Sequence, residues 1–157
     1  MAKHILSVLV ENHAGVLSRV AGLFSRRGFN IESLAVGVTE NPDVSRMTIV
    51  VEGDEYIVEQ VSKQLNKLIN VIRVKKLESQ DSVRRELALI KVVATAATRS
   101  EIIQIVEIFR AKIIDVSRNT LTIEASGDEE KISALEQMLK QFGIKEIVRT
   151  GLIALER

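Results

Sequence analysis

Apolar residues along the chain follow two alternating periodicities. Residues 16–24 and 57–68 place apolar side chains at helical spacing with polar ones on the other side, which predicts two amphipathic helices. Gly28 is a typical helix stop, and Asp54 is a typical helix cap. Short, mostly apolar runs rich in strand-forming residues lie before, between and after these helices, and they predict strands at residues 5–10, 31–38, 44–51 and 71–77.

The order strand, helix, strand, strand, helix, strand is that of the split βαβ, or ferredoxin-like, fold. Right-handed crossovers then place both helices on one face of a four-stranded antiparallel sheet. The expected strand order is fourth, first, third, second, which leaves residues 31–38 at an edge. An apolar edge strand invites aggregation unless it is paired. We therefore expect a homodimer that pairs through this edge.

The rest of the chain repeats the same pattern. Thr98–Glu101 has the form of a capping box and predicts the start of a helix, and residues 128–141 predict another. The strands expected in this half are residues 86–95, 113–116, 120–125 and 144–155.

The predicted fold class is therefore α+β, with two tandem ferredoxin-like βαββαβ domains. The stretch from Glu78 to Ser82 has neither periodicity and reads as a linker. The predicted boundaries are a first domain at 1–78, a linker at 79–83 and a second domain at 84–157.

Composition narrows the possible functions. The chain has 157 residues and a net charge of +1, so no strongly basic surface is available for nucleic acid. An RNA-recognition module shares this strand order but needs aromatic residues on its central strands, whereas the aromatic residues here fall in helices or at element ends. With no Cys and only His4 and His13, the chain has little material for a nucleophilic triad or a multi-His metal site, and we assign no catalytic or metal-ligating residue.

The cellular location is inferred from two patterns that the sequence does not contain. The sequence has no run of about 20 apolar residues of the kind that spans a membrane. It also begins without a signal-peptide pattern. We expect a cytoplasmic protein.

One segment suggests a binding site. Residues 12–17, Asn-His-Ala-Gly-Val-Leu, lead from a strand directly into a helix. Free backbone N–H groups and the helix dipole at such a point suit a carboxylate or phosphate, and Gly15 allows close approach. The alternative is an ordinary turn capped by Asn12, with His13 as a surface residue. Residues 95–98, the corresponding place in the second half, have neither Gly nor Asn. We therefore expect the first domain to bind a small molecule and the second to contact a partner.

Several longer motifs resemble a known family. They are GVLSRV at 15–20, FSRRGFNIESL at 24–34, SRMT at 45–48, RAKIIDV at 110–116 and RTGLIAL at 149–155. The chain closely resembles, over essentially its whole length, the regulatory (small) subunit of acetohydroxyacid synthase, also called acetolactate synthase. The first half of that subunit is an ACT domain.

The resemblance implies a non-catalytic subunit without a cofactor of its own. Its partner would be the catalytic large subunit, which carries thiamine diphosphate, a divalent metal and FAD. The regulatory subunit would activate the large subunit and confer feedback inhibition by valine or a related branched-chain amino acid. A stand-alone ACT-type amino-acid sensor acting on another protein remains an alternative. A small enzyme on the same scaffold is a weaker one, because catalytic groups are scarce.

The resemblance also implies an effector site. The family pairs ACT domains edge to edge and places the effector between the first strand-to-helix loop of one chain and the second strand of its partner. An amino-acid carboxylate would meet the helix N-terminus and the ammonium would meet Asn12 or Asn30. The branched tail would meet Val16, Leu17 and Ile31. Many relatives have Pro or Ser where Ala14 stands. The residues that match the family site are Asn12, Ala14, Gly15, Val16 and Leu17 from the loop, and Asn30 and Ile31 from the second strand.

Overall fold

A computed structural model describes residues 2–157, which form two compact units. The first unit runs to Val83 and also contains Leu152–Arg157, and the second is Arg84–Gly151. The elements of the first unit are β1 (Lys3–Glu11), α1 (Val16–Arg27), β2 (Ile31–Val38), β3 (Val44–Glu52), α2 (Glu55–Asn66), β4 (Val71–Leu77), the short 3-10 helix η1 (Ser79–Asp81) and β9 (Ile153–Glu156).

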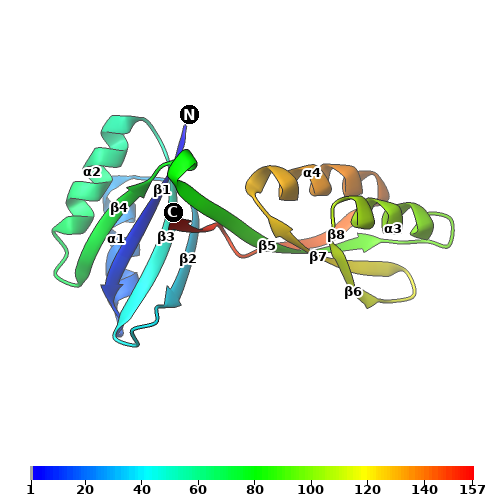
Figure 1. Cartoon of the computed structure of the whole chain (residues 1–157), viewed down its shortest axis with the longest axis horizontal. Helices are drawn as coiled ribbons and strands as arrows, with labels where there is room; N and C mark the ends of the chain where they lie inside the picture. The colour runs from blue at the N-terminus through cyan, green and yellow to red at the C-terminus, as the bar shows by residue number, and fades with distance from the viewer. Residues whose placement is uncertain (1) are drawn as a thin grey trace. The chain divides into compact units, whose positions relative to one another are not determined.

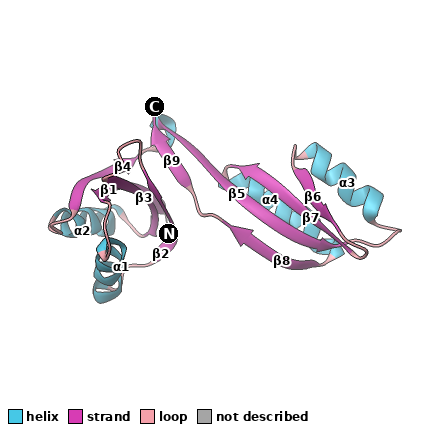
Figure 2. Cartoon of the chain, turned by 90° about the horizontal axis from the view of Figure 1, so that it is seen from below, coloured by secondary structure: helices cyan, strands magenta, loops and turns pink. Residues whose placement is uncertain are grey.

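The first unit has the predicted sheet. Its strands are antiparallel in the order β2-β3-β1-β4, so β2 lies at an edge as expected. Helices α1 and α2 both lie on one side of this sheet (Figures 1 and 2). Alternate residues of β1 point toward the helices, because successive side chains of a strand face opposite sides. The resulting core contains Leu6, Val8, Val10, Val20, Phe24, Met47, Ile49, Val61 and Leu65.

The opposite face of this sheet is partly covered by the end of the chain. Leu152 and Ala154 pack there against Ile5, Val50 and Leu77, and all five side chains are buried. The backbone N–H of Arg157 also donates to the carbonyl oxygen of Asp81, at 2.8 Å. Residues 152–157 thus complete the first unit although they come last in the sequence.

The second unit repeats the architecture. Its elements are β5 (Ser82–Val93, whose first two residues belong to the first unit), α3 (Arg99–Ile108), β6 (Lys112–Val116), β7 (Thr120–Gly127), α4 (Glu129–Leu139), the 3-10 helix η2 (Lys140–Phe142) and β8 (Ile144–Arg149). The strand order is β6-β7-β5-β8, and the paired strands are antiparallel. The chain is therefore a tandem of two ferredoxin-like units, the α+β class that the sequence predicts.

Three local expectations were wrong. The single strand expected at residues 144–155 is two strands, because Gly151 takes a left-handed φ of 84° between β8 and β9. The part of that stretch from Leu152 onward belongs to the first unit rather than the second. Thr98 makes no capping hydrogen bond to α3, since its hydroxyl accepts from the backbone N–H of Thr95 at 3.0 Å.

The predicted start of α2 was correct. Asp54 caps α2 by accepting from the backbone N–H of Ile57 at 2.9 Å, as predicted. The stretch expected as an unstructured linker, residues 79–83, is instead the 3-10 helix η1 followed by the first two residues of β5. That strand begins at Ser82, four residues before its predicted start. Within residues 2–157, every helix is too short or too polar to cross a lipid bilayer.

Candidate functional site

The loop between β1 and α1 is held open by its backbone geometry. Gly15 precedes the helix with a φ of 87°, a left-handed conformation that side chains disfavour. Asn12 does not cap the helix. Its side-chain nitrogen instead donates to the carbonyl oxygen of Pro42 at 2.8 Å, and its backbone N–H donates to that of Asp43 at 2.8 Å. The side-chain oxygen of Asn12 remains as an acceptor.

Several backbone donors at the start of α1 lack partners. The N–H groups of Gly15, Leu17 and Ser18 meet no acceptor in the part of the chain that the structure describes. The first turn of α1 contains no acidic residue, so no side chain of that turn offsets the positive end of the helix dipole. The loop can therefore bind a carboxylate or another small anion.

A polar cluster fixes this loop from the side. His13 donates from Nε2 to Oε2 of Glu11 at 2.9 Å, and Nδ2 of Asn70 donates to the same oxygen at 3.4 Å. Asn70 precedes β4, is 8% exposed, and accepts a hydrogen bond from Arg19 of α1 on its side-chain oxygen. Hydrogen bonds from His13 and then Asn70 lower the pKa of the Glu11 carboxyl. Asn70 thus connects the end of β1 with helix α1.

The predicted loop residues differ in what they expose. The Val16 side chain is 3% exposed and belongs to the core, so only its backbone could contact an effector. The expected contact of this side chain with a branched tail is therefore wrong. Leu17 is 46% exposed and offers an apolar surface at the same point. Ala14 and Asn12 are exposed.

The two halves of the predicted site lie at opposite ends of the sheet within one chain. Ile31, at the start of β2, pairs with Val51, which pairs with His4 at the start of β1. The loop instead follows Glu11 at the other end of β1. Seven residues of strand separate these points, or about 23 Å at about 3.3 Å per residue. Asn30 is exposed, and Ile31 is half-buried against the core.

Sequence reasoning missed Glu11, Arg19 and Asn70. Asn70 lies 57 residues from His13 and 51 from Arg19, so no local pattern links them. Only the fold shows that these residues meet, because it brings the loop before β4 beside the end of β1. Among residues 2–157, no group of three or more His, Asp or Glu side chains is arranged to hold a metal ion.

Comparison with known proteins gives a consistent result over the whole chain. Residues 6–73 match the family described as the AHAS small subunit-like ACT domain, and residues 85–157 match that described as the small subunit of acetolactate synthase. The chain is 59% identical over 155 residues to a probable acetolactate synthase small subunit of Archaeoglobus fulgidus, covering 99% of this chain and 97% of the relative. It is 61% identical over 154 residues to the acetolactate synthase small subunit of Mycobacterium leprae, covering 98% and 91%.

A solved structure agrees with these sequence relatives. The crystal structure of the acetolactate synthase small subunit from Thermotoga maritima matches with a TM-score of 0.93 and 46% identity, covering 100% of this chain and 98% of that one. Both units of the chain thus find their counterparts in one kind of protein. The chain belongs to the acetolactate synthase small-subunit family, and its first unit is an ACT domain.

Proposed function

We propose that this chain is the regulatory subunit that activates the catalytic large subunit of acetolactate synthase and makes it sensitive to valine or a related branched-chain amino acid. The large subunit would carry the catalytic cofactors. The observation that carries the proposal is the β1–α1 loop, where left-handed Gly15 exposes unpartnered N–H groups at the positive end of α1. Family membership supplies the partner and the class of effector.

The effector site is completed by a second copy of the chain. Strand β2 is an edge strand, and its residues Val36 and Val38 are 46% and 59% exposed. Antiparallel pairing of two β2 strands places the start of one beside the end of the other. Because the end of β2 lies at the loop end of the sheet, the partner's β2 start would approach the β1–α1 loop. A dimer thereby joins two halves that one chain keeps about 23 Å apart.

Each part of an α-amino acid has a matching group in this arrangement. Its carboxylate would accept from the N–H groups of Gly15 and Leu17. Its ammonium would donate to the side-chain oxygen of Asn12, which the bond to Pro42 holds in place. Its branched tail would contact the exposed Leu17 side chain and the partner's β2 start, where each chain carries Asn30 and Ile31.

Regulation then follows from linkage. An effector can change the activity of the large subunit only as far as the effector binds one arrangement of the dimer more tightly than the other. This difference in binding free energy is typically about 1 to 3 kcal/mol. Tight binding with equal affinity for both arrangements would leave activity unchanged.

The test is acetolactate production from pyruvate by a cognate large subunit, with and without this chain and with and without L-valine. We expect the chain to raise the rate and valine to lower it again. If valine has no effect, leucine and isoleucine are assayed in its place. Activation that none of the three lowers would contradict the effector assignment but not the assignment of the large subunit as the partner. No change in rate, with both proteins folded and the cofactors present, would contradict the proposal and favour the stand-alone sensor.

A further inference from the structure

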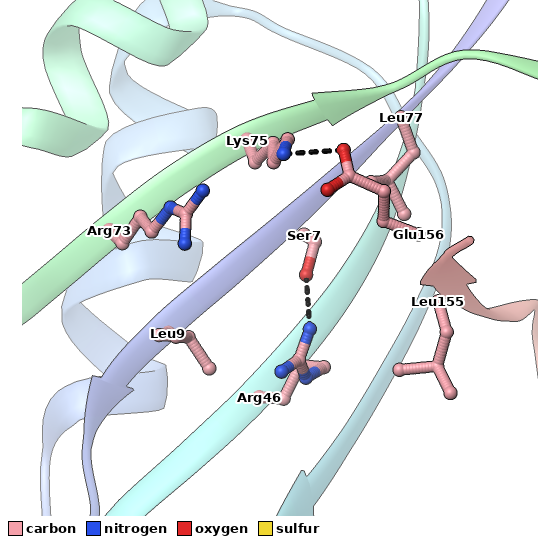
Figure 3. Close-up of a pocket in the computed structure, with 8 residues that line it drawn as sticks. All are labelled: Ser7, Leu9, Arg46, Arg73, Lys75, Leu77, Leu155 and Glu156. Atoms are coloured by element: carbon pink, nitrogen blue, oxygen red, sulfur yellow. Dashed lines mark hydrogen bonds and ion pairs between the residues drawn. The ribbon is translucent and has the colours of Figure 1, made fainter. Parts of the chain in front are cut away.

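The open face of the first sheet contains a cavity that the proposed effector site does not use. Its volume is about 240 Å³. Strands β1, β3, β4 and β9 line it, whereas the edge strand β2 does not contribute. Its lining residues, shown in Figure 3, are Ser7, Leu9, Arg46, Arg73, Lys75, Leu77, Leu155 and Glu156.

The register of the sheet brings the cationic side chains together. Leu9 of β1 pairs with Arg46 on one side and with Arg73 on the other, so both arginines share its face. Lys75 lies two residues further along β4 and pairs with Ser7. Cross-strand neighbours lie about 5 Å apart, and their long side chains can therefore converge on one ligand.

The charges of this cavity are not balanced. Three cationic side chains face a single carboxylate, that of Glu156, which leaves two positive charges in excess. Arg46 donates only to the neutral hydroxyl of Ser7, at 3.0 Å, and Arg73 meets no acceptor among residues 2–157. Guanidinium groups bind oxyanions through paired hydrogen bonds, and two of them here have no carboxylate partner.

Glu156 shows what kind of group the cavity accepts. Its carboxylate enters from β9 and forms an ion pair with Lys75 (Figure 3). The Lys75 and Glu156 side chains are 36% and 47% exposed, and an ion pair this exposed contributes little to stability. A ligand with more negative charge than one carboxylate can therefore displace it.

We propose that this cavity binds a small oxyanion with two or more negative charges, held by Arg46, Arg73 and Lys75 in competition with Glu156. The volume falls below the roughly 300 to 1,000 Å³ of drug-sized ligand pockets, which favours a small ligand. Phosphate and carboxylate groups share the required chemistry. The proposal is independent of the valine site, because the two sites share no residue.

Isothermal titration calorimetry on the full chain tests this, with pyrophosphate and citrate as probes at fixed ionic strength. We expect at least one probe to bind, and the one that binds identifies the phosphate or the carboxylate source. Arg73→Gln and Arg46→Gln should each weaken binding about tenfold, the size of a lost charge-assisted hydrogen bond. Glu156→Gln should tighten it, because the internal competitor loses its charge.

The matched control is Lys63→Gln, which removes one exposed positive charge from α2 on the other side of the sheet. Equal weakening by Lys63→Gln and Arg73→Gln would overturn the proposal, since it would show only a general charge effect. Absence of binding by both probes to the wild type and to Glu156→Gln would also overturn it. Circular dichroism confirms that each variant is folded, and neither result depends on the large subunit or on valine.

Discussion

The side-chain oxygen of Asn70 accepts a hydrogen bond from the guanidinium of Arg19, and this joins the segment before β4 to helix α1. The backbone oxygen of Asn70 also accepts from the N–H of Glu11 at 2.9 Å, so one residue contacts both sides of the β1–α1 loop. The loop that we propose to hold the effector carboxylate is thereby fixed before any ligand arrives. Such preorganisation lowers the ordering cost of binding.

Replacing Asn70 with Ala should loosen the loop. The change removes the side-chain acceptor of Arg19, so the free energy of unfolding should fall by about 0.5 to 1.5 kcal/mol. The response to valine should weaken in parallel. Urea unfolding and a valine titration of the assembled enzyme measure the two effects. Asn66→Ala, at the exposed end of α2, is the control and should change neither. Wild-type stability in Asn70→Ala would show that the cluster does not hold the loop.

Replacing Gly15 with Asp should greatly weaken the valine response and spare activation. The carboxylate of Asp would stand near that of the effector, and like charges about 4 Å apart repel by about 1 to 4 kcal/mol. The valine concentration for half-inhibition should therefore rise more than about fivefold.

The control for this variant is Gly15→Asn, which separates charge from backbone strain. Asn and Asp have nearly the same shape, and both tolerate a positive φ better than other side chains. Gly15→Asn should thus keep much more of the inhibition than Gly15→Asp. Equal loss in the two variants would indicate strain, and full inhibition in Gly15→Asp would place the carboxylate elsewhere.

Acid should destabilise the first unit through Glu11. Hydrogen bonds from His13 and Asn70 lower the pKa of this carboxyl below its ordinary value of 4.5. A lowered folded-state pKa contributes stability that is present above pH 4.5 and is lost as the pH falls from there through the folded-state pKa. Unfolding measured between neutral pH and about pH 3.5 should show a smaller acid-induced loss in Glu11→Gln than in the wild type. The exposed Glu59→Gln on α2 should lose stability like the wild type; an identical profile in Glu11→Gln would refute the assignment.

Charges on the β2 edge should separate the proposed dimer. The double change Val36→Lys and Val38→Lys places like charges on both copies at the edge where they would pair. Light scattering should report a dimer for the wild type at micromolar concentration and a monomer for this variant. The monomer should also lose valine binding, because each site needs the partner's β2.

The opposite edge of the same sheet supplies the control for the dimer. Ile72 lies on β4 and is 54% exposed, so Ile72→Lys adds a charge at an equally accessible apolar position. It should leave the dimer intact. A monomeric wild type, or a double variant that stays dimeric, would exclude pairing through β2.

Much of the fold was predictable because local pattern and crossover handedness leave few choices. Strand periodicity located β1 to β4, and the right-handed rule placed β2 at an edge. The break between β8 and β9 was missed, since residues 144–155 were interpreted as one strand that continues through Gly151. Only the left-handed Gly151 and the destination of Leu152 reveal two strands.

The candidate site was predictable where it depends on consecutive residues. The run 12–17 identified the loop and Gly15 without any tertiary information. Asn70 escaped prediction because its role depends on contacts across more than 50 residues. Helical spacing placed Val16 on the apolar face of the first helix, where the structure has it, but did not show that its side chain is closed to an effector.

The return of residues 152–157 to the first unit sets an order of events during synthesis. A ribosome that has made the chain as far as Val83 has not yet made Leu152 and Ala154. Until then, Ile5, Val50 and Leu77 lack the side chains that pack against them in the finished unit. All of Arg84–Gly151 is translated in between. The first unit to emerge is therefore the last to be completed, and its open sheet face stays uncovered throughout that interval.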